Sequence, residues 1–338
     1  MNCEIVVEIG NSHEGSLGIA KSFMEIAASS GAKIVKFQMH LPNYESTEFE
    51  PFRKKFSDQD LSRIEYWERT SFSRDEWEKI IFYATKLGLE FMCTPFSVEA
   101  AQWLFDIGAV KRWKVGSGDA ANLPFLDFLV STGLPIIIST GLISWQEILY
   151  LKNRLESFRA LDRVTFLHCV SEYPTPIEKS GFNVFHDLVN EFGKAGFSDH
   201  SGNVLTGLYA ISQNALLLEV HMTPHKGFFG PDTSSSLLPE EVEFLCKFND
   251  FVRNIKTNNI SKQRLFEDSS ETRKIFRKGI YWASDKAKGH IVTIKDLHFR
   301  KPMMSIDAID FEKILGSRIR RDVKFLNAVL EADLESDK

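Results

Sequence analysis

The sequence predicts a (β/α)8 barrel followed by a small β-rich module. Within about 255 residues, short apolar runs alternate eight times with longer amphipathic segments. Strands that alternate with helices favour a parallel sheet, and eight such units in this length are typical of a closed barrel. No Gly-x-Gly-x-x-Gly motif opens the first helix, which makes a doubly wound sheet the less favoured alternative.

The apolar runs and the amphipathic segments define the predicted elements. The first run, Val6-Val7-Glu8-Ile9-Gly10, ends in glycine, and the next segment places Ile19, Phe23 and Ile26 at helical spacing. The predicted strands cover residues 6–10, 33–38, 90–93, 112–115, 135–138, 164–167, a short run from 196, and 216–220. The predicted helices cover residues 18–30, 74–87, 98–107, 123–132, 145–158, 184–192, 207–213 and 239–255.

The chain beyond the barrel changes character. We assign residues 1–255 to the barrel, the polar residues 256–273 to a linker, and residues 274–338 to a second domain. This second domain contains short β-like runs at 279–283 and 290–293 and a short helical run at 309–315.

A long insertion at residues 42–72 interrupts the barrel pattern and carries several aromatic residues among charges. Two interpretations stay open. It is either a surface insertion packed on its own aromatic side chains or a lid over the end of the second strand.

The charge composition indicates which kinds of binding partner to expect. The formal net charge of −5 argues against nucleic acid, because there is no basic excess to neutralise a phosphate backbone. A local basic pocket for a small anion is still compatible with this negative net charge.

The four cysteines, Cys3, Cys93, Cys169 and Cys246, are scattered without a Cys-x-x-Cys and are expected to be reduced. With neither a membrane-spanning run nor a signal peptide in the sequence, we expect a cytoplasmic protein with no membrane partner.

Nearly every predicted strand ends in polar residues, which in such a barrel are the catalytic candidates. Two of them are lysines, and two buried lysines at one barrel mouth would repel each other unless an anion lies between them. Short serine hydroxyls at the ends of three strands, Ser117, Ser139 and Ser198, suit phosphate or carboxylate oxygens. The candidates at the strand ends include Glu8, Lys36, Gln38, Thr94, Lys114, Ser117, Ser139, Tyr173, Ser198, His200, Glu219 and His221.

His200 and His221 end adjacent strands, so their imidazoles can meet at one metal ion. With oxygen ligands completing the shell, Mn²⁺ or Mg²⁺ is favoured over Zn²⁺. Taken singly, each residue also has a structural explanation, since Glu8 and Lys36 can be an interior ion pair and each histidine a core residue. Because all these residues are expected to meet at one end of the barrel, a catalytic or binding site is favoured over separate structural roles.

A series of short motifs runs in order through the predicted barrel. They are Glu8-Ile9-Gly10, His13-Glu14-Gly15, Val35-Lys36-Phe37-Gln38, Thr94-Pro95-Phe96, Lys114-Val115-Gly116-Ser117-Gly118, Ser139-Thr140-Gly141, His168-Cys169, Tyr173-Pro174-Thr175-Pro176, Ser198-Asp199-His200, Glu219-Val220-His221 and Gly230-Pro231-Asp232. In this order they resemble the sialic acid synthase family, whose bacterial members make N-acetylneuraminate and related nonulosonates. The tail, with Arg277-Lys278-Gly279, Lys301-Pro302 and Gly316-Ser317-Arg318, is similar to the antifreeze-like (SAF) domain of that family.

The resemblance implies a reaction in which phosphoenolpyruvate condenses with the open-chain aldehyde of an N-acetylmannosamine-like sugar. It implies that Glu8 handles the proton of the attacking water or of the tetrahedral intermediate, and that a divalent metal, Mn²⁺ or Mg²⁺, is held by His200 and His221. It also implies a homodimer in which each SAF domain caps the partner's barrel. The implied phosphoenolpyruvate ligands are Lys36, Lys114, Ser117, Ser139 and Ser198, and the implied sugar-facing residues are Gln38, Thr94, Tyr173, Asp232, Arg300 and Lys301.

The sequence departs from the family pattern mainly at positions expected to face the sugar. Ser12, Asp119 and Ser171 replace residues common in the family, and the tail has Arg300-Lys301-Pro302 where an Arg-Pro-Gly run is expected. Lys301 offers a point charge in place of a planar guanidinium. We therefore expect the reaction class to be kept and the acceptor sugar to differ.

Two rival functions stay open. One is a metal-dependent aldolase or hydrolase on the same barrel, which would use Glu8 and the two histidines without needing the lysine and serine set. The other is a non-catalytic sugar-binding protein that retains the fold.

Overall fold

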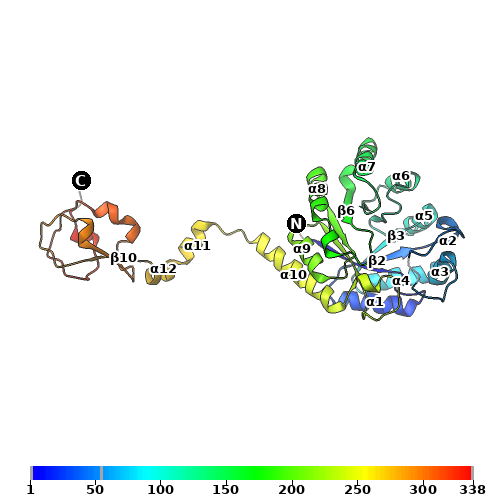
Figure 1. Cartoon of the computed structure of the whole chain (residues 1–338), viewed down its shortest axis with the longest axis horizontal. Helices are drawn as coiled ribbons and strands as arrows, with labels where there is room; N and C mark the ends of the chain where they lie inside the picture. The colour runs from blue at the N-terminus through cyan, green and yellow to red at the C-terminus, as the bar shows by residue number, and fades with distance from the viewer. Residues whose placement is uncertain (1–2, 54–55, 336–338) are drawn as a thin grey trace. The chain divides into compact units, whose positions relative to one another are not determined.

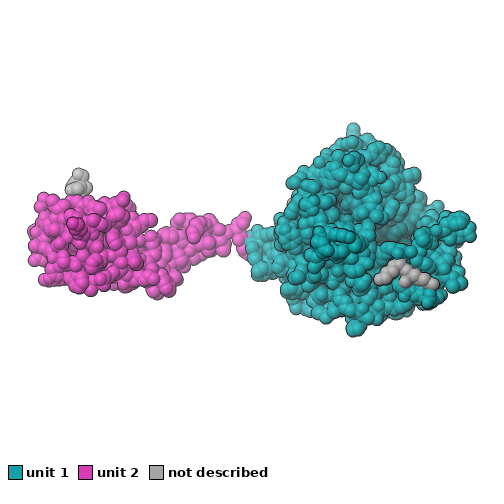
Figure 2. Space-filling model, in the orientation of Figure 1, with its two compact units in different colours: residues 1–257 teal, residues 258–338 magenta. Residues whose placement is uncertain are grey.

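The computed structural model describes residues 3–53 and 56–335 and contains two compact units, Met1–Thr257 and Asn258–Lys338 (Figures 1 and 2). The first unit is a parallel sheet in the order β3-β2-β1-β8-β7-β6-β5-β4, and β3 and β4 lie against each other to close it. Its strands are β1 (Glu4–Gly10), β2 (Ile34–Met39), β3 (Glu90–Pro95), β4 (Trp113–Val115), β5 (Ile136–Ser139), β6 (Val164–Cys169), β7 (Gly196–Asp199) and β8 (Leu217–Met222). The predicted (β/α)8 barrel is confirmed.

Helices surround these strands in Figure 1, and their polar starts explain where they begin. Ser73 and Ser144 each form a capping box with a glutamate three residues later, which satisfies backbone N–H groups at the helix start. The helices are α1 (Leu17–Ser29), α4 (Arg74–Lys86), α5 (Val98–Asp106), α6 (Leu123–Ser131), α7 (Trp145–Ser157), α8 (Phe182–Phe192), α9 (Val204–Ser212) and α10 (Pro239–Thr257). After β8, a short strand β9 (Ser236–Leu237) pairs with it in parallel.

A small apolar layer fills the centre of the barrel and positions the site above it. This layer consists of Val6, Ile34, Met92, Ile137, Leu167 and Leu217, one residue from each of six strands. Side chains on a strand alternate between its two faces, so the residues two positions further along point inward as well. On five of these strands those residues are Glu8, Lys36, Thr94, Ser139 and Glu219. The apolar layer is therefore the support for a polar layer at the carboxyl ends of the strands.

The insertion contains two helices, α2 (Pro42–Glu45) and α3 (Arg63–Thr70), which the sequence pattern did not predict. Arg69 of α3 pairs with Glu14, at 2.9 Å, in the loop that follows β1. Tyr66 and Trp67 are buried, and the Phe56 ring contacts both Tyr66 and Phe229. The segment thus packs on its own aromatics and is anchored to the barrel.

The second unit has its own hydrophobic core. A two-stranded antiparallel sheet joins β10 (Gly279–Trp282) to β11 (Leu297–Arg300), and Trp282 is fully buried among apolar neighbours. The predicted strand at 290–293 is wrong: Ile291 makes only an isolated bridge to Arg318, because Thr293 caps a 3-10 turn instead. The helical run predicted at 309–315 is a 3-10 helix, Ala308–Ile314.

The segment expected to be a linker is largely helical. α10 ends at Thr257, and two short helices follow, α11 (Lys262–Asp268) and α12 (Ser270–Phe276), both within the second unit. Ser261 accepts a hydrogen bond from the Arg264 backbone, so a side-chain cap starts a helix in a polar sequence. Among the described residues, no helix has both the length and the apolarity to cross a bilayer.

Candidate active site

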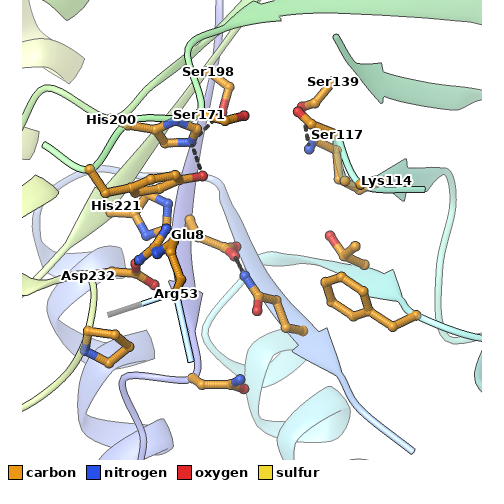
Figure 3. A pocket seen from close by; sticks show the side chains of 18 of the residues that line it. Glu8, Arg53, Lys114, Ser117, Ser139, Ser171, Ser198, His200, His221 and Asp232 are labelled. Atoms are coloured by element: carbon orange, nitrogen blue, oxygen red, sulfur yellow. Dashed lines mark hydrogen bonds and ion pairs between the residues drawn. The ribbon is translucent and has the colours of Figure 1, made fainter. Parts of the chain in front are cut away.

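Twelve of the fourteen predicted site residues line one cavity of about 620 Å³ at the carboxyl ends of the strands. Figure 3 shows Ser139, Ser117 and Lys114 on one side of this cavity, His200, His221 and Asp232 on the other, and Glu8 between them. The twelve are Glu8, Lys36, Gln38, Thr94, Lys114, Ser117, Ser139, Tyr173, Ser198, His200, His221 and Asp232. The other two, Arg300 and Lys301, belong to the second compact unit.

The floor of the cavity is a buried group of two lysines and two glutamates. Lys36 Nζ lies 2.9 Å from Glu8 Oε2 and 3.6 Å from Glu219 Oε2, and Lys114 Nζ lies 3.6 Å from Glu219 Oε1. All four residues are at most 4% exposed. Glu219 therefore bridges the two lysines and acts as an internal counterion between them.

These contacts shift the pKa values of the buried lysines and of Glu219. Burial disfavours the charged form of Lys36, but Glu219 and Glu8 outweigh it, so its pKa is raised. For Lys114 burial prevails over the attraction of Glu219, and its pKa is lowered. Burial likewise opposes charge on Glu219, but Lys114 and Lys36 together hold the pKa of its carboxyl below the usual range.

Hydroxyl groups surround the lysines. The Lys114 ammonium donates to Ser139 Oγ at 2.8 Å, and the Lys36 ammonium donates to Thr94 Oγ1 at 3.2 Å. Ser198 donates to Glu219 Oε1 at 3.0 Å, and Ser117 Oγ accepts the Gly141 backbone N–H at 3.1 Å. Ammonium and hydroxyl donors gathered in this way can bind the oxygens of a small anion.

Glu8 is oriented by its neighbours on β1 and β2. Gln38 donates from Nε2 to Glu8 Oε1 at 2.7 Å, while Lys36 holds the other carboxylate oxygen. Gly10 has a φ of +54°, and a Cβ there would lie 3.3 Å from Glu8 Oε1 and 3.4 Å from Gln38 Nε2. Glycine at the strand end thus allows both the turn and the close approach of this pair.

His200 and His221 lie with their ring centroids 5.5 Å apart. Nδ1 of His200 is 2.7 Å from the Val170 carbonyl and donates to it, so Nε2 has a lone pair directed toward Tyr173 Oη at 3.2 Å. Burial, and then His221, lower the pKa of His200 to about 3, so this ring is neutral.

A neutral imidazole whose other nitrogen is fixed by a carbonyl has the donor chemistry of a metal ligand. Among residues 3–53 and 56–335, no three or more His, Cys, Asp or Glu side chains are arranged to hold a metal ion. The two histidines therefore suit an ion that takes its remaining ligands from oxygen atoms of substrate or water.

The histidine side of the cavity contains an arginine that no pattern in the sequence indicated. Arg53, from the insertion, donates to Asp232 Oδ1 at 2.9 Å, and its guanidinium lies 3.9 Å from the centroid of the Tyr173 ring. Burial opposes charge on Asp232, but His221 and Arg53 lower the pKa of its carboxyl. The insertion is thus part of the cavity wall, which favours the lid interpretation over a purely surface one.

Other cavity residues were also missed. Glu219 was noted at a strand end but given no role, although its position two residues before His221 on the same strand face was a usable signal. The insertion residues offered no such signal, because they follow no strand and no helical period. The lining residues without a predicted role include Asn11, Glu50, Arg53, Arg63, Tyr66, Trp67, Phe96 and Glu219.

The arrangement can bind an anion, polarise an oxygen and move a proton. Lys114, Ser117 and Ser139 form one side of the cavity, and His200, His221 and Asp232 form the other. Ser198 lies beside His200, with its Oγ 3.4 Å from Nε2, and the Tyr173 ring stacks on His200. Glu8 stands between the two sides, so its carboxylate can take a proton from a reactant bound across both.

Comparison with known proteins identifies the family. The sequence model of the NeuB family matches residues 23–261. The chain is 31% identical to the N,N'-diacetyllegionaminic acid synthase of Campylobacter jejuni over 325 residues, or 95% of this chain and 96% of that protein. It is 29% identical to the synthase of the same name from Legionella pneumophila, over 99% of this chain and 96% of that one.

A solved structure of a sialic acid synthetase also matches this chain. The crystal structure of the N-acetylneuraminic acid (sialic acid) synthetase of Leptospira borgpetersenii, in complex with citrate, matches with a TM-score of 0.69 and 25% identity. The match covers 81% of this chain and 92% of that one. The family model spans more than half of the sequence, so the chain belongs to the NeuB family of sialic acid synthase-like enzymes.

Proposed function

We propose that the chain condenses phosphoenolpyruvate with an N-acetylmannosamine-like sugar aldehyde and releases a nonulosonic 2-keto acid and phosphate. The observation that carries the proposal is one cavity in which Lys114, Ser117 and Ser139 face a histidine pair across Glu8. Lys36 and Ser198 line the same cavity. The relatives named as nonulosonic acid synthases support it.

In the proposed reaction, C3 of phosphoenolpyruvate forms a bond to the aldehyde carbon, whose oxygen takes up a proton. Water then adds at C2, and Glu8 accepts a proton from it. Collapse of this tetrahedral centre breaks the bond between C2 and the phosphate oxygen. The C2 hydroxyl passes its proton to the departing phosphate, which leaves the 2-keto group and free phosphate. Lys36, Lys114, Ser117, Ser139 and Ser198 hold the phosphoenolpyruvate anion during these steps.

A divalent metal, Mn²⁺ or Mg²⁺, is the cofactor we assign to His200 and His221. When bound, it supplies Lewis-acid polarisation of the aldehyde oxygen. Gln38, Thr94, Tyr173 and Asp232 line the space left for the sugar.

We infer that the active unit is a homodimer and that the second unit is an SAF-like cap supplying Arg300 or Lys301 to the partner's cavity. Within this unit Lys301 Nζ lies 5.3 Å from the Phe276 ring, and Arg300 lies beside His298. Exclusion of water by a cap would strengthen the electrostatic interactions of the cavity.

The decisive experiment is an acceptor screen with phosphoenolpyruvate, read by phosphate release and by product mass. The panel contains N-acetylmannosamine, its 6-phosphate and a hexose with two acetamido groups, the last because two relatives are named for a diacetylated product. Phosphate that appears only when both substrates are present supports the condensation. Sugar cleavage without phosphoenolpyruvate would favour the aldolase or hydrolase alternative.

The matched control is Glu8→Gln, which keeps the shape of the side chain and removes its charge. A catalyst loses product formation in this variant, whereas a sugar-binding protein makes no product in either form.

A further inference from the structure

A line of buried hydrogen bonds leads from Glu8 to a histidine that does not line the cavity. His40 follows β2, and Glu45 ends α2. The His40 Nδ1 atom lies 2.5 Å from Glu45 Oε1, and its Nε2 atom lies 3.3 Å from Gln38 Oε1. Gln38 in turn donates to Glu8 at 2.7 Å. The line therefore runs from Glu45 through His40 and Gln38 to Glu8.

The donors and acceptors along this line define how many protons His40 carries. Glu8 pairs with Lys36 and accepts hydrogen bonds, so the amide NH₂ of Gln38 faces Glu8 and the amide oxygen faces His40. Glu45 is also an acceptor, since its other oxygen accepts the Leu41 backbone N–H at 3.3 Å. Both nitrogens of His40 thus face acceptors, and the pattern is complete only when both carry a proton.

The surroundings of His40 suit a positive charge. The His40 residue is 4% exposed. Its ring stacks between Trp67, with centroids 3.7 Å apart, and Phe96, with centroids 4.4 Å apart. A cation is attracted to the faces of aromatic rings. The Trp67 indole is itself held by a 3.0 Å hydrogen bond to Glu50, which fixes one wall of the stack.

The other titratable groups near His40 are Asp119 and His13, in addition to Glu45. Burial raises the pKa of Asp119, while His40 acts to lower it. Burial, and then His40, lower the pKa of His13 to about 3, so His13 adds no positive charge.

We propose that His40 is a positioning residue that, with both ring protons in place, fixes the Gln38 amide so that its NH₂ group orients the Glu8 carboxylate. A neutral ring with a lone pair on Nε2 would favour the flipped amide, whose oxygen would face the Glu8 carboxylate and repel it. His40 does not line the cavity, so its influence passes through Gln38. This inference rests on the proposed function, because it assigns Glu8 the proton transfer.

The test uses His40→Phe, which keeps a ring between Trp67 and Phe96 and removes both hydrogen bonds. We expect kcat for phosphate release to fall about tenfold to hundredfold, as misplacement of a catalytic group does. The KM for phosphoenolpyruvate should stay within about twofold, since the lysine and serine subsite is unchanged. A loss of packing alone would not separate kcat from KM in this way.

A double-mutant cycle with Gln38→Ala decides whether His40 acts through Gln38. The combined variant should be no slower than Gln38→Ala alone, whereas multiplied effects, or full kcat in His40→Phe, would overturn the inference. If His40→Phe does not fold, Glu45→Gln takes its place in the cycle and the same two outcomes decide. Nitrogen-15 spectra of the His40 ring in the full chain give a test independent of activity, and a singly protonated ring would refute the proposal. A wild-type chain that releases no phosphate would refute the proposed function and leave the spectral test standing.

Discussion

Replacement of Lys114 by methionine tests the anion subsite directly. The change removes an ammonium that lies 2.8 Å from Ser139 Oγ and 3.6 Å from Glu219 Oε1, while nearly conserving the length of the side chain. A hydrogen bond to a charged group contributes about 1.5–3 kcal/mol. At about 1.4 kcal/mol per factor of ten, the dissociation constant of phosphoenolpyruvate should rise by roughly 10- to 150-fold.

The same substitution also affects stability, because Glu219 loses one of its two lysine partners. Breaking a buried ion pair costs about 3–5 kcal/mol, and we expect less here since Lys36 and Ser198 still contact Glu219. The double variant Lys114→Met/Glu219→Gln removes both charges, so it should regain thermal stability without regaining affinity. This pair of variants separates the role in binding from the role in folding.

Calorimetric titration with phosphoenolpyruvate and thermal melting measure the two effects. Lys111→Met is the matched control, because Lys111 is an exposed lysine just before β4 and does not line the cavity. A dissociation constant for Lys114→Met within twofold of the control, or a change confined to the KM of the sugar, would refute the reasoning.

Three further predictions concern the metal, the cap and the second unit. Chelation should abolish phosphate release while the melting curve stays nearly unchanged, and added Mn²⁺ or Mg²⁺ should restore it; full turnover in chelator would exclude a metal at His200 and His221. If the cap acts in trans, mixing inactive Glu8→Gln chains with inactive Lys301→Ala chains should restore part of the activity; a mixture that stays inactive despite subunit exchange contradicts this. In the second unit, burial opposes charge on Asp296, but Lys286 and other hydrogen-bond donors lower its pKa below the unfolded value of about 3.9. Its depressed pKa stabilises the fold above that value, and the stabilisation is lost as pH falls further. Asp296→Asn should therefore destabilise the unit by about 1–3 kcal/mol at neutral pH and by less in acid, as pH-dependent denaturant melts would show; an equal loss at both pH values would contradict the assignment.

Much of the barrel could be predicted because its signals are local. Each strand is a short apolar run, and the polar residues at its carboxyl end stand out from it, which led to Glu8, Lys36 and Ser139. The residues that close the cavity from outside could not be found this way. Arg53 reaches Asp232 across 179 positions in the sequence, and only the fold brings them together.

The second unit was less predictable for a different reason. Its backbone is paired largely through isolated bridges, such as Tyr281 with Ala328 and Lys286 with Val323, instead of long ladders. A single bridge does not require apolar and polar residues to alternate over several positions. The sequence of this unit therefore lacks the period of two by which strands are predicted. The helices at 262–276 were missed because polar residues dominate them, and their apolar residues Leu265, Phe266, Ile275 and Phe276 are too few to repeat at helical spacing.

The internal pairing of charges in the cavity has a consequence for the rate at which substrate arrives. Lys36 and Lys114 are matched by Glu8 and Glu219, and at the rim Arg53 is matched by Asp232. Such a cavity presents little net field to an approaching anion, and the chain as a whole carries a formal charge of −5. Electrostatic attraction should therefore not speed the entry of an anionic substrate into the cavity. Raising the ionic strength should leave its association rate unchanged or slightly increase it. Discrimination among anions would then arise after entry, when the incoming oxygens compete with Glu219 for the two ammonium groups.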